Sequence, residues 1–129
     1  MIYLDTSVLL AHLLAEDRRP PEAFWRQTLV ASRLLEYETW CRLHARGLGE
    51  QMGDQARQLL ARVSMLELVP PVLTRALDPF PVPLRTLDAL HLASADFLRR
   101  QGQAVRFATY DQRLAAVSEA IGLPLEPLD

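Results

Sequence analysis

The sequence contains no lysine, so all 14 of its basic side chains are arginines. The absence of lysine excludes a Schiff base, a P-loop phosphate site and the lysine-assisted pocket of an acidic phospho-acceptor domain. The single cysteine, Cys41, cannot form an internal disulfide, which indicates a reducing compartment such as the cytoplasm. Nothing around Cys41 favours a reactive thiolate, so we expect it to fill space in a helix. No apolar run approaches a membrane span of about 18 residues, so we expect no membrane segment.

Short apolar runs alternate with longer amphipathic segments along the chain. We expect strands at 2–4, 29–31, 66–69 and 105–108 with a last edge strand at 124–126, and helices at 8–15, 22–27, 33–46, 50–64, 72–77, 87–101 and 111–122. The residues expected to cap helices are Thr6 or Ser7, Ser32 and Thr86. The alternation predicts an α/β fold with a central parallel sheet, and the length of 129 residues predicts one domain, 1–129.

Four acidic residues stand where a strand ends or a helix begins: Asp5, Glu38, Asp88 and Asp111. In an α/β fold the carboxyl ends of the strands meet at one crevice, where such folds bind their ligands. Two carboxylates about 5 Å apart repel by about 3 kcal/mol at an effective dielectric constant of about 20. Such a cluster holds either protons or a divalent cation, and oxygen ligands favour a hard ion such as Mg²⁺ or Mn²⁺. A carboxylate-held Mg²⁺ with room for phosphate oxygens is a phosphodiester-cleaving site.

Each of these acids also has a simpler structural explanation. Asp5 and Asp111 fit the N-caps of the helices that follow them, and for Asp111 taken alone the cap is the better interpretation. Asp88 falls in a first helical turn, where acids are common, although its apolar neighbours predict a partly desolvated carboxylate. Glu38 fits a solvated helix acid. Because Glu36 points about 160° away from it, only one of the two glutamates can face a shared crevice.

Other polar residues near the acids are candidates for supporting roles. Ser7 and Thr109 are candidates to bond the carboxylates or a metal-bound water, with capping as an equal alternative. Arg85 and Arg113 flank the acids in sequence and are candidate substrate-binding residues, with ordinary surface charge as the alternative.

Two residues on the helix of Asp88 are expected to lie outside the metal ligands. We expect His91, one turn away, to be a structural hydrogen-bonding residue. Asp96 is roughly 12 Å further along the axis and about 80° around it. On another helix, Arg42 and Arg46 form an i,i+4 pair that can face substrate, solvent or a partner.

Charge and aromatic content bear on the partners of the chain. The net charge of −2 argues against a nonspecific nucleic-acid binder, which would normally be basic. It does not exclude a nuclease, because the acidic cluster contributes to the count and a bound metal would offset it. Large aromatic rings gather in the first part of the chain, and we expect some of them to line a partner groove: Phe24, Trp25, Tyr37 and Trp40.

Four stretches together resemble the PIN domain, and within it the VapC-type toxins of bacterial toxin–antitoxin pairs. They are MIYLDTSVLL around Asp5, SRLLEYE ending at Glu38, LRTLDALHLASA around Asp88 and FATYDQRLAAVSEAIGL around Asp111. They occur in the family's order over nearly the whole chain, and the third followed by the fourth is the most specific. The resemblance implies a three-layer α/β/α sandwich with a central parallel sheet. It also implies a Mg²⁺-dependent endoribonuclease in which Mn²⁺ can substitute.

The resemblance further places the metal ligands on Asp5, Glu38, Asp88 and Asp111. It implies a homodimer, a cognate VapB-type antitoxin that covers the site, and an RNA substrate such as tRNA or a ribosomal RNA loop. Two other hypotheses stay open. One is a stand-alone PIN nuclease without an antitoxin, and the other is a non-catalytic interaction module in which the acids serve as caps and salt-bridge partners.

Overall fold

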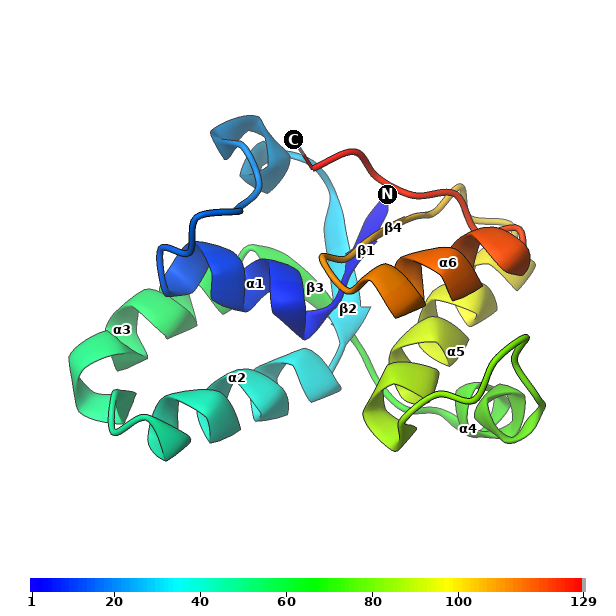
Figure 1. The fold of residues 1–129 in the computed structure, drawn as a ribbon, viewed down its shortest axis with the longest axis horizontal. Helices are drawn as coiled ribbons and strands as arrows, with labels where there is room; N and C mark the ends of the chain where they lie inside the picture. The colour runs from blue at the N-terminus through cyan, green and yellow to red at the C-terminus, as the bar shows by residue number, and fades with distance from the viewer. Residues whose placement is uncertain (129) are drawn as a thin grey trace.

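A four-stranded parallel sheet lies between two layers of helices in the computed structural model, which describes residues 1–128 (Figure 1). In chain order the elements are β1 (Ile2–Leu4), α1 (Thr6–Leu13), the 3₁₀ helix η1 (Glu22–Arg26), β2 (Leu29–Ser32), α2 (Leu34–Ala45), α3 (Gly49–Leu60), β3 (Val63–Leu66), α4 (Pro70–Leu77), α5 (Thr86–Arg100), β4 (Arg106–Ala108) and α6 (Gln112–Ala120). The strand order is β3-β2-β1-β4. The predicted α/β/α arrangement is therefore confirmed.

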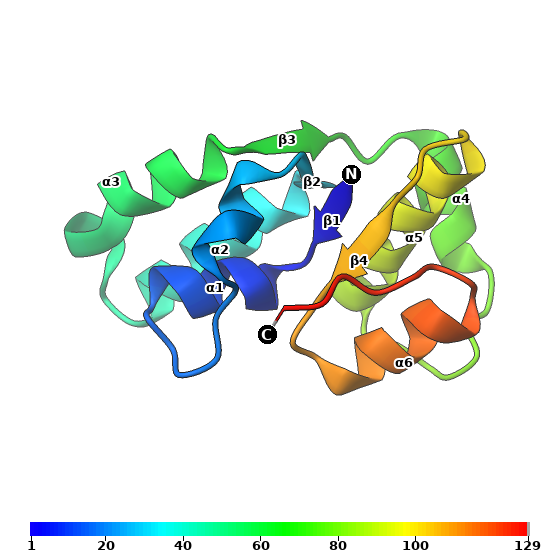
Figure 2. The same ribbon diagram turned by 90° about the horizontal axis from the view of Figure 1, so that it is seen from above.

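Alternating side chains on the strands build one core on each face of the sheet. Ile2 and Leu4 of β1 join a core that contains side chains of α1, α2 and α3. Tyr3, between them, joins the other core with Phe107 of β4 and side chains of α5 and α6. Figure 2 shows α1, α2 and α3 on one side of the strands and α4, α5 and α6 on the other. Because helices cover both faces, β1 and β2 are buried at every position.

The carboxyl ends of all the strands share one edge of the sheet, since every pairing is parallel. In the centre, β1 pairs with β2 on one side and with β4 on the other. The chain passes from β1 through Asp5 into α1, and from β4 through 109–111 into α6. Side chains at these two strand-to-helix junctions therefore lie at the same edge, beside each other.

The position of β3 differs from the sequence prediction. The predicted strand at 66–69 begins three residues too late, because β3 is Val63–Leu66, and the predicted helix at 50–64 is correspondingly too long. The position of β3 in the sequence is set by its pairing with β2, in which Leu29 lies opposite Val63. Such a tertiary contact determines where a strand begins and ends, and a local run of apolar residues does not reveal it.

The predicted helix caps are also wrong. The residues predicted to cap α1 and α5 lie inside these helices: Thr6, Ser7 and Thr86. The N-cap of α1 is Asp5, whose carboxylate accepts a backbone hydrogen bond. The N-cap residue of α2 is Arg33 and not the predicted Ser32, although Ser32 Oγ accepts a hydrogen bond from the Leu34 N–H at 3.1 Å beside the start of the helix.

Cys41 and two of the aromatic residues lie at or near the surface. Cys41 is exposed on α2, so the prediction that it fills space is wrong. Phe24 and Trp25 are buried in the core on the α1 side of the sheet, and Trp40 is partly buried against that core. Tyr37 is exposed. Core packing therefore accounts for two of the four rings.

The C-terminal segment covers the outer edge of β4. The predicted last strand at 124–126 is reduced to a single parallel bridge between Leu125 and Phe107. Backbone bonds from the Phe107 N–H to the Pro124 carbonyl and from the Glu126 N–H to the Phe107 carbonyl fix this segment. Within residues 1–128, no helix combines the length and the apolar character that crossing a bilayer requires.

Candidate active site

Asp5 and Asp111 are the N-cap residues of the helices that leave the neighbouring strands β1 and β4. Asp5 Oδ1 accepts a hydrogen bond from the Val8 N–H at 3.4 Å. Asp111 Oδ1 accepts from the N–H groups of Arg113 and Leu114 at 2.9 and 3.1 Å. The capping interpretation of both residues is therefore correct. Because β1 and β4 are paired in parallel, the two caps stand at the same edge of the sheet.

Two hydroxyl groups bind the buried Asp5 carboxylate. Ser7 Oγ donates to Oδ1 at 2.6 Å, and Thr109 Oγ1 donates to Oδ2 at 2.5 Å. Each hydroxyl also accepts from the turn after β4, Ser7 from the Tyr110 N–H at 3.0 Å and Thr109 from the Asp111 N–H at 2.9 Å. Burial raises the pKa of Asp5 above its ordinary value, and the two hydroxyls oppose this effect. Ser7 and Thr109 thus contact an acid directly.

Asp88 on α5 and Glu38 on α2 differ in the direction of their pKa shifts. Burial raises the pKa of Asp88 above its ordinary value, the negative charges of Asp111 and Glu38 add to this effect, and the charges of Arg85 and His91 oppose it. Burial alone would raise the pKa of Glu38 as well, but hydrogen bonds from His91 and Thr6 outweigh it and lower that pKa. Asp88 therefore carries the cost of the shared negative charge, whereas Glu38 is held as a carboxylate.

His91 connects Glu38 to the sheet. Its Nε2 lies 2.6 Å from Glu38 Oε1, and its Nδ1 lies 2.7 Å from the Tyr3 hydroxyl. The prediction of a structural hydrogen-bonding histidine agrees with these contacts. Sequence reasoning missed Tyr3 and Thr6 as members of this network, because a tyrosine within an apolar strand and a threonine at a helix start give no local signal of such contacts.

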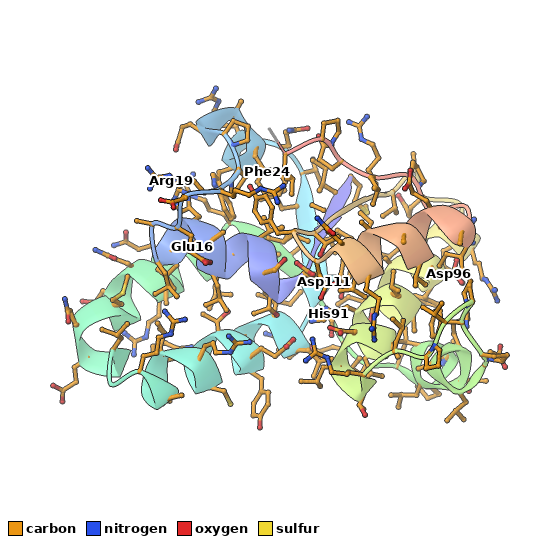
Figure 3. The ribbon with its side chains drawn as sticks, in the orientation of Figure 1. Glu16, Arg19, Phe24, His91, Asp96 and Asp111 are labelled. Carbon is orange, nitrogen blue, oxygen red and sulfur yellow. The ribbon has the colours of Figure 1, made fainter. Side chains whose placement is uncertain are left out.

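The other acids on these helices lie apart from the cluster. Glu36 is exposed, 3.8 Å from an Arg33 guanidinium nitrogen, whereas Glu38 turns inward and accepts from Thr6 Oγ1 at 2.9 Å. Asp96 is bound by three arginines. Figure 3 shows Asp96 well apart from Asp111 and His91, as expected for a residue outside the ligand set.

An open cavity of about 580 Å³ lies beside the junctions after β1 and β4. Its acidic lining is Asp5, Asp88, Asp111, Glu16 and Asp17, its basic lining is Arg18, Arg42 and Arg46, and the remainder is Thr6, Ser7, Leu10, Ala11, Leu14, His91 and Tyr110. Three of the four predicted acids therefore face this acidic cavity. Glu38 adjoins it through its bonds to Thr6 and His91. Figure 3 shows His91 and Asp111 together near the centre of the molecule.

The arginines of the acidic cavity are not those that flank the acids in sequence. Arg85 extends into solvent, with its Nε 3.5 Å from Asp88 Oδ2. Arg113 lines a separate cavity with residues 81–83. The sequence marked Arg42 as one member of an i,i+4 pair with several possible environments. It gave no signal for Arg18, which lies in the loop after α1.

The donor chemistry of the acidic cavity suits a hard divalent cation. Carboxylate oxygens are the ligands that Mg²⁺ and Mn²⁺ prefer. Among residues 1–128, no three His, Cys, Asp or Glu side chains stand close enough together to hold one ion. The carboxylates instead surround the space, and the raised pKa of Asp88 reflects burial and their mutual repulsion. A cation between them would offset that repulsion, so the chemistry of the donor set fits such an ion, although the side chains would have to close in to bind it together.

The PIN domain family matches residues 2–120, which is most of the chain. This chain belongs to the PIN domain family. Three relatives of this PIN domain in Mycobacterium tuberculosis are named ribonucleases. VapC47 of strain CDC 1551 / Oshkosh is 34% identical over 128 residues, VapC46 of strain ATCC 25618 / H37Rv is 32% identical over 126, and VapC35 is 32% identical over 129. Each alignment covers 95% of this chain and 93% of the relative.

The acidic cavity belongs to the part of the chain that the family shares. Every residue that lines it, and Glu38 beside it, falls within residues 2–120. The similar lengths of this PIN domain and its relatives mean that the alignments span nearly the whole of both chains.

Proposed function

We propose that this PIN domain is a divalent-metal-dependent endoribonuclease and the toxin of a toxin–antitoxin pair. The observation that carries the proposal is the set of carboxylates around one open cavity, with arginines on the same wall. The relatives named ribonuclease VapC support RNA as the substrate. Capping accounts for the placement of Asp5 and Asp111 at this edge, and Asp88 adds a third carboxylate to the same open space, where like charges repel.

Asp5, Asp88, Asp111 and Glu38 would hold Mg²⁺ or Mn²⁺ in this site. A bound divalent ion supplies an activated water and stabilises negative charge on the phosphoryl oxygens during hydrolysis. The chain's own groups prepare the site for this chemistry. Ser7 and Thr109 fix both oxygens of Asp5, and His91 and Thr6 fix one oxygen of Glu38.

The arginines on the cavity wall would take the backbone phosphates of RNA. Arg42 lies on the last turn of α2 and Arg46 is its C-cap residue, and Arg18 lines the same space from the loop after α1. Guanidinium groups bind phosphate oxygens in a forked geometry. Arg85 stays a candidate beside Asp88, and Arg113 stays a candidate that the comparison of variants below tests.

A VapB-type antitoxin would be the cognate protein partner, and we propose a homodimer as the toxin's own assembly. Exposed apolar side chains on and after α4 support a protein-covered surface. They are Leu73, Leu77 and Val82. A tRNA or a ribosomal RNA loop is the proposed target, by analogy with the family.

Cleavage of RNA by the purified protein tests the proposal. We expect cleavage with Mg²⁺ or Mn²⁺ and none with EDTA or in Asp88→Asn, with Glu36→Gln as the matched acidic control that keeps activity. Sequencing of the RNA ends identifies the target. Binding of Mn²⁺ at about 100 times its Kd should stabilise the wild-type protein by about 2.7 kcal/mol, which a melting curve detects.

Two results would select the other hypotheses. If Mn²⁺ leaves the melting temperature unchanged and no RNA is cleaved, the chain is a non-catalytic module. If RNA is cleaved but the product of the neighbouring open reading frame neither binds the protein nor inhibits it, the chain is a stand-alone nuclease.

A further inference from the structure

His91 lies between a buried tyrosine and the Glu38 carboxylate. It belongs to α5 and is 1% exposed. Its Nε2 is 2.6 Å from Glu38 Oε1, and its Nδ1 is 2.7 Å from the Tyr3 hydroxyl. The three side chains come from α5, α2 and β1. One imidazole ring therefore connects the centre of the sheet with the helix that carries Glu38.

The groups around this ring select which nitrogen carries the hydrogen. Glu38 as a carboxylate can only accept, so Nε2 must donate. The Tyr3 hydroxyl accepts from the Ser32 N–H at 3.0 Å, and burial raises the pKa of Tyr3, so the phenol keeps its proton. Nδ1 faces that hydroxyl at 2.7 Å, and the Ser94 hydroxyl donates to the Leu90 carbonyl at 2.8 Å. The contact with Glu38 therefore requires hydrogen on Nε2, the nitrogen that faces the carboxylate.

Both hydrogen bonds to Glu38 fall on the same oxygen. Thr6 Oγ1 donates to Oε1 at 2.9 Å, in addition to the bond from His91 Nε2. Among residues 1–128, the second oxygen, Oε2, accepts no hydrogen bond. Two donors on one oxygen hold the carboxylate in a single orientation and leave the other oxygen available to a ligand.

Tyr3 is itself held rigidly, and it fixes the position of His91. Its side chain is fully buried, and its ring stacks on Phe107 with centroids 5.6 Å apart and planes 9° from parallel. The ring meets His91 edge-on, with centroids 5.9 Å apart. Ser32, whose N–H binds the hydroxyl, is the last residue of β2. Two paired strands therefore fix the position from which the tyrosine holds the imidazole.

We propose that His91, held by Tyr3, is a positioning residue that orients Glu38 toward the metal site. This inference rests on the proposed function, because Glu38 acts there as a metal ligand. An apolar side chain would fill the same space but would leave Glu38 to exchange between rotamers. Removing a hydrogen-bonding partner of a metal ligand commonly changes metal affinity or activity by about 10- to 100-fold.

Binding of Mn²⁺ alone, measured by calorimetry, reports the orientation of Glu38 without RNA. We expect His91→Leu to weaken Mn²⁺ binding by about 10- to 100-fold. His91→Gln places an amide donor near the position of Nε2 and should restore most of the affinity, which it could not do if the imidazole were itself a ligand. In RNA cleavage, His91→Leu should lower kcat and leave KM nearly unchanged. His44→Leu, at an exposed position of α2, is the matched control and should change neither value.

Tyr3→Phe tests the other end of the network, and it does not depend on the folding of His91→Leu. The change keeps the ring stack and removes the hydroxyl, so Nδ1 loses its partner while Nε2 still faces Glu38. Nitrogen-15 NMR of the metal-free protein reads each ring nitrogen of His91 directly. The wild type should carry hydrogen on Nε2, Tyr3→Phe should shift the Nδ1 resonance, and Tyr37→Phe, which removes an exposed hydroxyl, should match the wild type.

Three results would overturn the inference. They are equal Mn²⁺ affinity in His91→Leu and wild type, equal loss in His91→Gln and His91→Leu, and the absence of hydrogen on Nε2 in the wild type. Asp88→Asn separates this inference from the proposed function. If Asp88→Asn removes Mn²⁺ binding while His91→Leu keeps it, the positioning role alone fails. If Asp88→Asn binds Mn²⁺ as the wild type does, the metal site is refuted and the positioning role with it.

Discussion

A buried carboxylate surrounded by three arginines connects α4 to α5. Asp96 is fully buried, and its Oδ2 lies 2.9 Å from Arg75 Nε and 3.1 Å from Arg100 Nε. Its Oδ1 accepts two hydrogen bonds from Arg99, at 2.5 and 3.1 Å. Arg75 comes from α4, and its guanidinium also lies 4.3 Å from the centroid of the Phe80 ring. Asp96→Ala removes the charge on which all of these contacts converge.

The cost of Asp96→Ala depends on which arginine stays buried without its partner. The side chains of Arg99 and Arg100 are 35% and 61% exposed, so water can replace their contact with Asp96. The side chain of Arg75 is 10% exposed, and its NH1 has no hydrogen-bond partner among residues 1–128. Leaving such a charge buried and unpaired costs about 3–5 kcal/mol. That is a large part of the roughly 5–15 kcal/mol that stabilises a typical domain.

Urea unfolding followed by circular dichroism measures this cost. Asp54→Ala is the matched control, because it removes the same group from an exposed pair with Arg57 and should cost about 0–1 kcal/mol. Adding Arg75→Leu to Asp96→Ala should recover part of the loss, since it removes the abandoned charge. Equal costs for Asp96→Ala and Asp54→Ala would refute the reasoning.

The same carboxylate predicts a dependence of stability on pH. Burial alone would raise the pKa of Asp96, but hydrogen bonds from Arg99 and Arg75 and the charges of Arg99 and Arg100 outweigh it, so the folded pKa lies below the unfolded one. The stabilisation is therefore complete above the unfolded pKa of about 3.9 and is lost as the pH falls through the folded value. The difference in stability between wild type and Asp96→Asn should shrink below about pH 4. A difference that stays constant on acidification would contradict this assignment.

Three sets of substitutions around the acidic cavity test charge repulsion, hydrogen bonding and substrate contact separately. Asp88→Asn should stabilise the metal-free protein at neutral pH by on the order of 1 kcal/mol, because burial and neighbouring acids raise the pKa of Asp88. In melting curves this gain should vanish below the ordinary aspartate pKa, where the carboxyl is protonated in both the folded and unfolded states. Thr109→Val should cost about 1–3 kcal/mol in urea unfolding, since the buried Asp5 carboxylate loses a donor. Arg42→Ala combined with Arg46→Ala should raise KM for RNA and reduce the dependence of log KM on log salt by about 0.7 per lost phosphate contact.

Matched variants make each of these results specific. Glu36→Gln removes an exposed acid and should leave the stability unchanged. Thr74→Val changes an exposed threonine of α4 and should cost little. Arg113→Ala removes a charge from a different cavity and should leave KM unchanged. If Arg113→Ala raises KM and the Arg42 and Arg46 changes do not, Arg113 is the better candidate for a substrate-binding residue.

Local sequence patterns were sufficient for most of the fold. The short apolar runs gave β1, β2 and β4 to within about one residue, because the buried positions of these parallel strands are mostly apolar. The bounds of β3 were missed, since residues 66–69 and Val63–Leu66 each contain three apolar residues and one polar residue, so the local pattern does not distinguish them. Pairing with β2 decides that choice, and it depends on residues more than 30 positions away in sequence. Cys41 was misplaced because the helical pattern around it does not define one face clearly.

The candidate site was predictable only where local geometry determines it. Strand ends and helix starts located Asp5, Asp88 and Asp111, and all three line one cavity. The bonds that hold Glu38 were not predictable, because they join side chains 53 positions apart in the case of His91 and 32 in the case of Thr6. No periodicity in a single helix encodes such a contact. Which arginines line the cavity likewise depends on how α2 and the loop after α1 are placed relative to the acids, and the local sequence does not show this.

Capping and metal binding, which compete as explanations of Asp5 and Asp111 in the sequence, are compatible in space. An N-cap at the end of a parallel strand must stand at the carboxyl edge of the sheet, so two acidic caps on neighbouring strands are brought together by their capping role. The cap bonds of both residues use Oδ1. Among residues 1–128, Asp111 Oδ2 and Glu38 Oε2 accept no hydrogen bond, and Asp5 Oδ2 accepts one, from Thr109. Asp111 and Glu38 thus use one oxygen to hold the side chain in place and leave the other as an acceptor, as a preorganised oxygen ligand requires. Asp5 is held through both oxygens and keeps the remaining acceptor capacity of Oδ2.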